Sequence, residues 1–230
     1  MTATSSTRGR LRPSYKTSPV VYAVMRWIIG RLMHVLYRYE IQGQENFPPH
    51  GAVIVAVNHL HILDPAAVAP AVSRQIVTLA ADKWQHNFLI NLFLRLAGSI
   101  FVQRGEVDRK ALRACFEVLE NGGVLAIAPE GTRSKTGRLQ RAKPGVAYLA
   151  TRTDAVIVPV AFWGVEKLRQ WLKLRRPRCQ VIIGKPFRLL VPKGKLSTDD
   201  LQELADVVAV QIGRLLPEEY RGIYAERIAA

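Results

Sequence analysis

The chain has 230 residues, of which 49% are hydrophobic, and it carries a formal net charge of +15 at pH 7. This length suffices for one α/β core, and this hydrophobic content excludes a disordered chain. Nearly all of the excess positive charge lies in three windows, residues 1–16, 131–143 and 165–178. Clustered lysine and arginine favour an anionic partner, which composition leaves open between nucleic acid, an anionic membrane surface and a phosphorylated substrate.

The two cysteines, Cys115 and Cys179, have no metal-binding spacing and fit a reducing, cytosolic setting. No cleavage site of small residues follows the first apolar segment, so no cleavable signal peptide is predicted. The chain also lacks an uncharged apolar run of about 18 residues, which argues against a helix that spans a bilayer.

Residues 1–38 predict a basic arm followed by a helix. Apolar side chains fill one half of that helix, whereas Arg26 and Arg31 lie on the other half together with Trp27. A broad apolar face, a cationic face and a preceding basic arm are typical of a helix in a membrane interface. An amphipathic helix packed on the core is the alternative. We therefore expect a membrane-association segment to residue 38 and an α/β domain over 39–230.

Beyond the first helix, short runs rich in β-branched residues alternate with segments of helical periodicity. The predicted strands are 37–43, 52–57, 75–80, 99–102, 123–128, 155–162 and 179–183. The predicted helices are 84–97, 107–121, 143–151 and 199–216. This alternation predicts the α/β class, with a mostly parallel, mixed central sheet flanked by helices. The helix over 84–97 has only a thin polar stripe, so it is either deeply packed or touches lipid.

Two histidines and a carboxylate follow the buried strand 52–57, within the segment 58–64. The pair Asp64-Pro65 predicts the start of a helix, with Asp64 as its N-cap. His59 then lies on the strand-to-helix turn, where a base and an orienting carboxylate can meet. The alternative is that Asp64 merely caps the helix and His59 is an ordinary polar residue.

Further candidate residues follow three other predicted strands, where open α/β sheets place their sites. They are Arg104, the run Pro129-Glu130-Gly131-Thr132-Arg133-Ser134, and Val158-Pro159. The run from Pro129 has the properties of an anion site, because Gly131 lets the backbone approach a ligand and Arg133 can bind a phosphate through two nitrogens. Thr132 adds a hydroxyl, and Glu130 could bind a ligand hydroxyl or fix an arginine. An ordinary polar turn is the alternative.

Taken in order, these segments resemble the motifs of the glycerolipid acyltransferase family, whose type members are 1-acylglycerol-3-phosphate (lysophosphatidate) acyltransferases. The pattern Asn-His-x4-Asp stands at 58–64, Gly-x-Ile-Phe-x-x-Arg at 98–104, Pro-Glu-Gly-Thr-Arg-Ser at 129–134 and apolar-Pro at 158–159. Two positions depart from the family: His61, where relatives often have a small hydroxyl residue, and Ala128, where they often have an aromatic one. Both departures could alter pocket shape.

The resemblance implies transfer of a fatty acyl group from a thioester donor to the free hydroxyl of 1-acylglycerol-3-phosphate, giving phosphatidate in phospholipid biosynthesis. Glycerol 3-phosphate or another lyso-lipid is the alternative acceptor. By resemblance, His59 is the general base and Asp64 orients it, and Pro159 lies on the acyl-donor side. The residues expected to bind the acceptor are Arg104, Glu130, Gly131, Thr132 and Arg133. No metal and no bound cofactor are expected, since acyl-CoA or an acyl carrier protein serves as a substrate.

The partners implied are an anionic membrane surface, a lyso-phospholipid acceptor and an acyl-thioester donor, at a peripheral (monotopic) site on the cytoplasmic face of the cell membrane. One rival function is a metal-dependent hydrolase that uses His59, His61 and Asp64, although few other ligands are available. Another is a non-enzymatic nucleic-acid-binding protein. The basic windows lack interleaved aromatic residues and any recognised binding module, so no nucleic acid is expected.

Overall fold

One mixed sheet organises the part of the chain that the computed structural model describes, which is residues 17–103, 108–191 and 194–229. Its strands are β1 (Arg38–Gln42), β2 (Val53–Val57), β3 (Ile76–Ala81), β4 (Ile100–Val102), β5 (Val124–Ile127), β6 (Val156–Trp163) and β7 (Arg178–Ile183). The α-helices are α1 (Pro19–Leu36), α2 (Asp64–Val68), α3 (Phe88–Leu96), α4 (Arg109–Glu120), α5 (Gly145–Ala150), α6 (Thr198–Leu215) and α7 (Ala225–Ala229). Short 3-10 helices are η1 (Gln44–Asn46), η2 (Ala69–Ala71), η3 (Asp82–His86), η4 (Val165–Lys173), η5 (Glu218–Tyr220) and η6 (Gly222–Tyr224).

The strand order is β1-β7-β6-β2-β5-β3-β4. β2 pairs in parallel with both β5 and β6, and β3 pairs in parallel with β5 and β4. β7 runs antiparallel to β6 and pairs in parallel with β1, so the sheet is mixed at this edge. The predicted α/β fold with a mostly parallel, mixed sheet is therefore confirmed.

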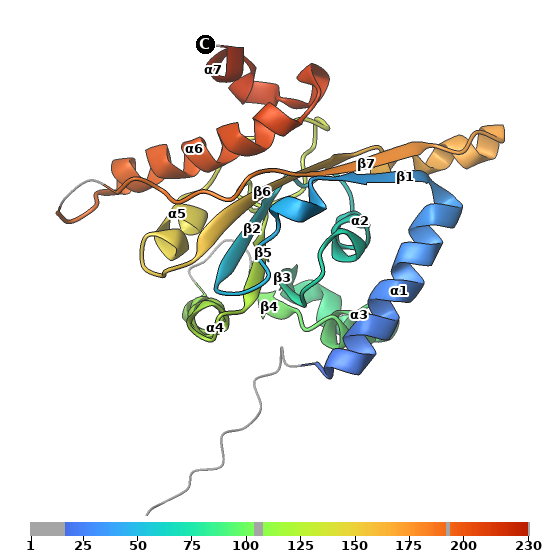
Figure 1. Cartoon of the computed structure of the whole chain (residues 1–230), viewed down its shortest axis with the longest axis horizontal. Coiled ribbons are helices and arrows are strands. Elements are labelled where there is room, and N and C mark those ends of the chain that lie inside the picture. Colours follow the sequence, from blue (N-terminus) through green and yellow to red (C-terminus); the bar gives the residue numbers. More distant parts are fainter. Residues whose placement is uncertain (1–16, 104–107, 192–193, 230) are drawn as a thin grey trace, which may run out of the picture.

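Helices cover both faces of the sheet, with α6 on one face and α1 and α2 on the other (Figure 1). The core is correspondingly double: one cluster joins the sheet to α4, α5 and α6, and the other joins it to α1 and α2. β2 contributes alternate residues to the two clusters, with Ile54 and Ala56 in one and Val53 and Val55 in the other. This burial on both faces explains its uninterrupted apolar sequence.

Two segments differ from the helices and loops expected from the sequence. The helix predicted over 84–97 divides into η3 and α3, because Asn87 caps α3 by accepting a hydrogen bond from the Ile90 amide at 3.1 Å. α3 is not deeply packed: Phe88, Leu92 and Leu96 are exposed. η4 was not predicted from the sequence, which also offered no signal for the short turns after α6, since segments of three residues show no helical periodicity.

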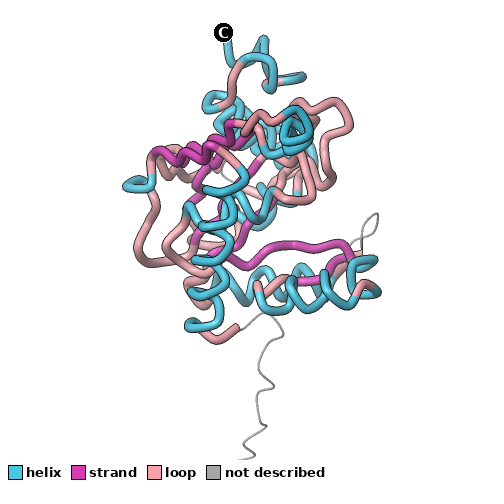
Figure 2. Tube along the Cα trace, turned by 90° about the vertical axis from the view of Figure 1, so that its right-hand side faces the viewer, coloured by secondary structure: helices cyan, strands magenta, loops and turns pink. Residues whose placement is uncertain are grey.

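α1 divides its broad apolar half between the protein and the outside. Tyr22, Ile29 and Met33 are buried against the domain, whereas a second apolar stripe is exposed. That stripe consists of Val20, Val21, Val24, Trp27, Ile28, Leu32 and Val35. Figure 2 brings this side of the molecule to the front. Trp27, which the sequence placed with the cationic face, therefore lies beside the exposed apolar residues, with the Arg31 guanidinium 5.5 Å from its ring centre.

By length and composition α1 could cross a membrane, although it contains two arginines and is therefore not the uncharged apolar run that the sequence was expected to lack. α1 has 18 residues with a mean hydropathy of 1.3, which satisfies the simple criteria for a spanning helix despite Arg26 and Arg31. Its packing nevertheless ties it to the domain, since the Arg26 side chain donates to the Val72 carbonyl at 2.7 Å. The division of the chain at residue 38 stays a prediction, and the basic arm lies outside the described residues.

Candidate active site

Two neighbouring parallel strands deliver the main candidate residues to one edge of the sheet. β2 pairs with β5 so that Ala56 lies opposite Ile127 near their carboxyl ends. The segments that follow, 58–64 and 128–134, therefore leave the sheet side by side, as parallel strands require. Ser134 confirms their proximity, because its amide donates to the carbonyl of His59 at 2.8 Å.

His59 and Asp64 form a hydrogen-bonded pair, with 2.6 Å between His59 Nδ1 and Asp64 Oδ2. Asp64 also accepts from the amides of Leu60 and His61, at 2.8 and 2.9 Å. Burial raises the pKa of Asp64, although the hydrogen bonds from His59 and these amides act in the opposite direction. Within the described residues no hydrogen bond engages His59 Nε2, so that nitrogen is available to a substrate.

Asp64 does not cap α2, contrary to the N-cap prediction. The helix begins at Asp64 itself, Leu63 occupies the capping position, and no side chain caps this end. The reason is that the carboxylate turns back to the preceding turn and orients His59 instead. Of the two interpretations left open by the sequence, a base with its orienting carboxylate is the one the geometry supports.

Glu130 is buried and accepts two backbone hydrogen bonds. Its Oε1 accepts from the His59 amide at 3.1 Å, and its Oε2 accepts from the Gln140 amide at 3.0 Å. Burial raises the pKa of Glu130 to about 7. The carboxyl group thus joins the turn of His59 to the loop that follows the Pro129–Ser134 run.

Three other predicted acceptor residues, Gly131, Thr132 and Arg133, lie on that loop. Gly131 lines the cavity described below and has a φ of 69°, a left-handed conformation that suits glycine. A side chain at this position would also meet Lys143, whose Cδ lies 3.0 Å from the place of a Cβ. Arg133 is exposed and Thr132 partly so. Arg104 lies outside the described residues.

Pro159 is separated from these residues. It is buried in β6, and its side chain lies beside Gly184, where a Cβ would come within 2.8 Å of Pro159 Cγ. Gly184 also faces Leu215 of α6, so Pro159 points to the face of the sheet that α6 covers. Pro159 does not line the cavity next to His59. Its acyl-donor role stays a prediction based on resemblance.

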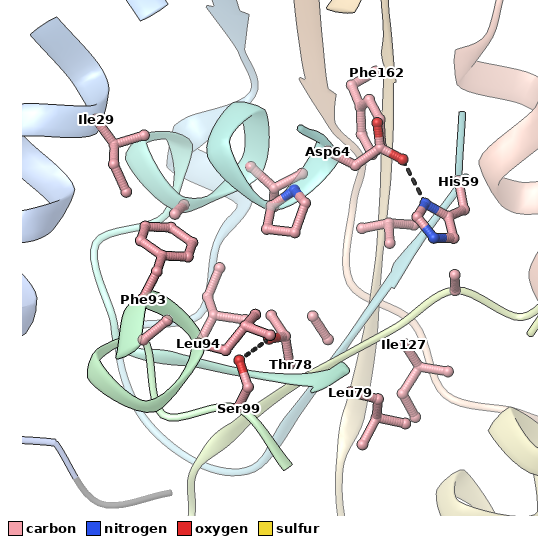
Figure 3. A pocket seen from close by; sticks show the side chains of 18 of the residues that line it. Ile29, His59, Asp64, Thr78, Leu79, Phe93, Leu94, Ser99, Ile127 and Phe162 are labelled. Carbon is pink, nitrogen blue, oxygen red and sulfur yellow. Dashed lines mark hydrogen bonds and ion pairs between the residues drawn. The ribbon is translucent and has the colours of Figure 1, made fainter. Parts of the chain in front are cut away.

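An apolar cavity of about 230 Å³ extends from His59 and Asp64. Its walls come from the ends of the central strands and from α1 and α3, including Met25, Ile29, Phe93 and Leu94. Figure 3 shows the His59–Asp64 pair at one side of this space and Ile29 and Phe93 at the other. Two polar groups inside it satisfy each other, because Thr78 Oγ1 and Ser99 Oγ are 2.8 Å apart. The cavity therefore suits a long apolar group whose polar end reaches His59.

The two departures from the family differ in their positions. Ala128 lines the cavity, as a residue that shapes a pocket must. His61 does not line it, and its Nδ1 accepts only a long contact of 3.4 Å from the Leu63 amide. The structure thus supports an effect on pocket shape for Ala128 alone.

Two residues near the site were given no role from the sequence, although Asn58 belongs to the motif at 58–64. Asn58 is buried, and its side chain forms two hydrogen bonds with β6: it donates to the Phe162 carbonyl at 2.8 Å and accepts from the Phe162 amide at 2.9 Å. Lys143 covers Gly131 although it lies beyond the motif. The position of Asn58 directly after β2 could have indicated its structural role. Lys143, in contrast, is brought next to residue 131 only by the fold.

The metal-dependent hydrolase finds no support in the side chains. In the ranges that the structure describes, no three His, Cys, Asp or Glu side chains come together as a possible metal site. Both cysteines are buried, and burial raises the pKa of each thiol to about 12. Neither thiol is therefore suited to bind a metal or to act as a nucleophile.

Comparison with known proteins relates this geometry to a family. The family model described as Acyltransferase matches residues 38–163. The 1-acyl-sn-glycerol-3-phosphate acyltransferase alpha of Bos taurus is 28% identical over 186 residues, which cover 77% of this chain and 63% of that protein. The 1-acyl-sn-glycerol-3-phosphate acyltransferase of Borreliella burgdorferi is 31% identical over 125 residues, which cover 54% of this chain and 50% of that protein.

A solved structure has the same fold. The 1-acyl-sn-glycerophosphate (LPA) acyltransferase PlsC of Thermotoga maritima superposes with a TM-score of 0.65 and 25% sequence identity, covering 84% of this chain and 79% of that one. The family match spans more than half of the chain and includes the His59–Asp64 pair, Glu130 and the cavity-lining Ala128. This chain belongs to the acyltransferase family.

Proposed function

We propose that the protein transfers a fatty acyl group from a thioester donor to the free hydroxyl of 1-acylglycerol-3-phosphate, giving phosphatidate. The observation that carries this proposal is the His59–Asp64 pair at one side of an apolar cavity, next to the cationic loop that follows Gly131. The names of the Bos taurus and Borreliella burgdorferi relatives support this acceptor. The chain spans 63% and 50% of those proteins, so the substrate assignment rests on the site as well as on the likeness.

The His59–Asp64 geometry supports general-base catalysis. The Asp64 carboxylate accepts from Nδ1, so the neutral ring carries its proton there and Nε2 has a free lone pair. Nε2 removes the proton of the acceptor hydroxyl as its oxygen attacks the thioester carbonyl carbon. The tetrahedral intermediate collapses, the carbon–sulfur bond breaks, and the thiolate takes the proton from His59. Asp64 holds the ring in place and stabilises the imidazolium between these steps.

The apolar cavity would hold an acyl chain. Its lining from α1, α3 and the strand ends offers dispersion contacts and excludes water, which a chain of methylene groups requires. Because Ala128 replaces a larger residue on this wall, the chain that fits is expected to differ from that of relatives with an aromatic residue here.

The acceptor phosphate would bind at the loop after β5. Arg133 is exposed there, Lys143 covers Gly131, and Thr132 supplies a hydroxyl. Arg can bind a phosphate through two nitrogens, and Lys adds a compact charge beside it. Arg104 is proposed for the same role by resemblance. Donors such as acyl-CoA or an acyl carrier protein are also anionic, and the basic windows suit either one.

We place the protein peripherally on the cytoplasmic face of the cell membrane, with the exposed stripe of α1 among the lipids. The stripe is apolar and Arg31 lies beside it, which is the composition of an interfacial helix. α3 adds exposed Phe88 and Leu92. Replacement of Ile28 and Leu32 by Ser should lower binding to anionic vesicles. This test is sharper than deletion of residues 1–38, which would also remove part of the cavity wall.

The decisive experiment is an assay of the purified protein with one labelled acyl-CoA and a small panel of acceptors. We expect 1-acylglycerol-3-phosphate to be acylated and the folded His59→Ala variant to have no activity. Full activity in that variant would overturn the mechanism, and a preference for glycerol 3-phosphate would correct the acceptor. Activity that a chelator removes and zinc restores would instead support the hydrolase.

A further inference from the structure

The 3-10 helix η4 forms a protrusion that the proposed reaction does not use. It connects β6 to β7 and lies near the C-terminal end of α1, at the end of the molecule where β1 and β7 pair (Figure 1). Neither η4 nor the turn after it contributes to the cavity next to His59. We call residues 169–175 of this protrusion the η4 tip.

Two leucine side chains at the η4 tip have almost no contact with the protein, and a tryptophan beside them is partly exposed. Leu172 is 85% exposed and Leu174 is 95% exposed, and Trp171 is 41% exposed. Leu174 also has a φ of 53°, a left-handed conformation that a leucine adopts only with strain and that Gly or Asn adopts more easily. An exposed and strained leucine gains nothing for folding, so this cluster points to a contact outside the chain.

Cationic side chains surround these leucines. Arg169, Lys173 and Arg175 are exposed, and none of them forms a salt bridge with another described residue. Nearby Arg178, in contrast, pairs with Glu40 at 2.7 Å. Exposed leucines with unpaired cations beside them match the chemistry of an anionic bilayer surface, where headgroups meet acyl chains.

The η4 tip is fixed to the helix proposed to lie in the membrane. Trp171 Nε1 donates to the carbonyl of Leu36 at 2.6 Å, and Arg176 donates to the carbonyl of Tyr37 at 2.7 Å. These bonds satisfy the carbonyls at the C-terminal end of α1, which have no partner within the helix. Leu32 and Val35 are exposed near this end of α1, so both the helix and the tip bound to its end carry exposed apolar side chains.

We propose that the η4 tip is a further membrane-contact element, beside α1 and α3: Leu172 and Leu174 insert among the acyl chains of an anionic bilayer, while the three cations bind lipid headgroups. This inference rests on the proposed membrane association of α1 and deepens it. One helix in an interface leaves the protein free to rotate about the helix axis. Contacts beside that axis, at the η4 tip as well as at α3, restrict the rotation and set the direction in which the site at His59 faces the lipid.

The test compares full-length variants for binding to vesicles of phosphatidylglycerol and phosphatidylethanolamine. The variant Leu172→Ser/Leu174→Asn should bind at least about tenfold more weakly, because each leucine side chain loses apolar burial. Asn tolerates the left-handed backbone of residue 174, so the fold should be kept. Leu190→Ser is the matched control, since Leu190 is 92% exposed outside the tip, and its binding should be unchanged.

A second variant separates charge from apolar insertion. Neutralising Arg169, Lys173 and Arg175 to Gln should weaken binding to the anionic vesicles by roughly fivefold per charge at low salt and leave binding to phosphatidylcholine vesicles unchanged. Unchanged binding of the Leu172→Ser/Leu174→Asn variant to the anionic vesicles, or an equal loss in the Leu190→Ser control, would overturn the proposal. So would a wild-type dimer in light scattering that the leucine variant converts to a monomer without a change in vesicle binding.

Turnover of soluble, short-chain substrates keeps this inference apart from the proposed reaction. The leucine variant should retain wild-type kcat on them, because the η4 tip touches neither His59 nor the cavity. Loss of vesicle binding with kcat retained supports the inference. Loss of both would overturn the proposal that the η4 tip contributes to membrane contact alone. Absence of acyl transfer in the wild-type protein would refute the proposed function while leaving the vesicle result to stand alone.

Discussion

Glu130 and His59 are joined through the backbone, because Glu130 Oε1 accepts from the His59 amide at 3.1 Å. The second oxygen accepts from the Gln140 amide at 3.0 Å, and the side chain is only 3% exposed. With both oxygens engaged by the protein, Glu130 positions the turn that carries His59, the proposed base, against the cationic loop. The contact with the acceptor that resemblance suggested for Glu130 stays a prediction.

Replacement of Glu130 by Gln should lower kcat and also change the pH dependence of stability. A glutamine has one oxygen in place of two, so one of the two buried amides loses its acceptor, at a cost of about 1–3 kcal/mol in the free energy of unfolding. Denaturant unfolding at pH 7, with a Glu120→Gln variant on the exposed end of α4 as the control, measures this cost.

The pH dependence follows from the raised pKa of Glu130. Burial raises it to about 7 from an ordinary 4.5, so between these values the folded protein binds more protons than the unfolded chain. The contribution of Glu130 to the free energy of unfolding therefore falls as pH rises through this window, by about 3 kcal/mol in total. The Glu130→Gln variant should lack this fall. An identical slope in variant and wild type would contradict the assignment.

Asp64→Asn should abolish most activity while the substrates still bind. The carboxylate accepts from His59 Nδ1 and from the amides of Leu60 and His61, whereas an asparagine offers one acceptor oxygen and presents an N–H group to the others. The His59 ring then loses its tautomer and orientation, which in a Ser-His-Asp triad costs about 10⁴ in kcat. Steady-state kinetics decides: an unchanged kcat, or a loss confined to KM, would exclude the orienting role.

The sequence predicted the strand ends that carry the site better than it predicted their details. Strong apolar runs located β2 and β5, and their parallel pairing follows from the alternation of strands and helices, so the meeting of His59 with the loop at Gly131 was predictable. The capping role expected for Asp64 was wrong because local spacing does not reveal that the carboxylate turns back toward His59.

Long-range packing could not be predicted from the sequence. The position of Lys143 over Gly131 depends on how the intervening loop returns, and the split of the α1 surface depends on what packs beneath the helix. Periodicity identified one broad apolar half of α1 but could not divide it into a protein-facing and an exposed stripe. The η4 protrusion was visible only as a basic window.

Lys143→Ala should weaken acceptor binding. Its side chain covers Gly131 at the proposed phosphate site, and a hydrogen bond from a charged group contributes about 1.5–3 kcal/mol, so KM for the acceptor should rise about 10- to 150-fold. KM for the acyl donor should change little. Lys135→Ala, an exposed lysine in the same window, is the control. A larger rise in KM for the acyl donor than for the acceptor would indicate that Lys143 binds the donor.

Ala128→Phe should shorten the acyl chain that the enzyme prefers. Ala128 lines the cavity of about 230 Å³ next to His59, and a phenyl ring there fills space that an acyl chain would occupy. We expect kcat/KM to fall for long-chain donors and to be retained for short ones, as measured with a series of acyl-CoA substrates. The same substitution at His61, outside the cavity lining, should leave the chain-length profile unchanged. Equal profiles for wild type and Ala128→Phe would refute the cavity as the acyl site.

Tyr224→Phe should remove a hydrogen bond that holds the cationic loop against the C-terminal segment. The Tyr224 hydroxyl accepts from the amide of Ala142, next to Lys143, at 2.8 Å and donates to Asp206 at 2.6 Å. Without the hydroxyl, the buried amide has no acceptor, which costs about 1–3 kcal/mol of stability.

The acceptor KM should rise in the Tyr224→Phe variant, because Lys143 directly follows Ala142, whose amide loses its acceptor. The amide of Lys143 itself donates to the Pro129 carbonyl, so both residues belong to the same loop. Tyr220→Phe is the matched control: its hydroxyl donates to Glu166 at 2.8 Å, away from the loop, so it should lose stability without a change in acceptor KM. Unfolding and kinetic measurements on both variants separate the two effects. If both raise the acceptor KM equally, the C-terminal segment acts through general stability and does not position the loop.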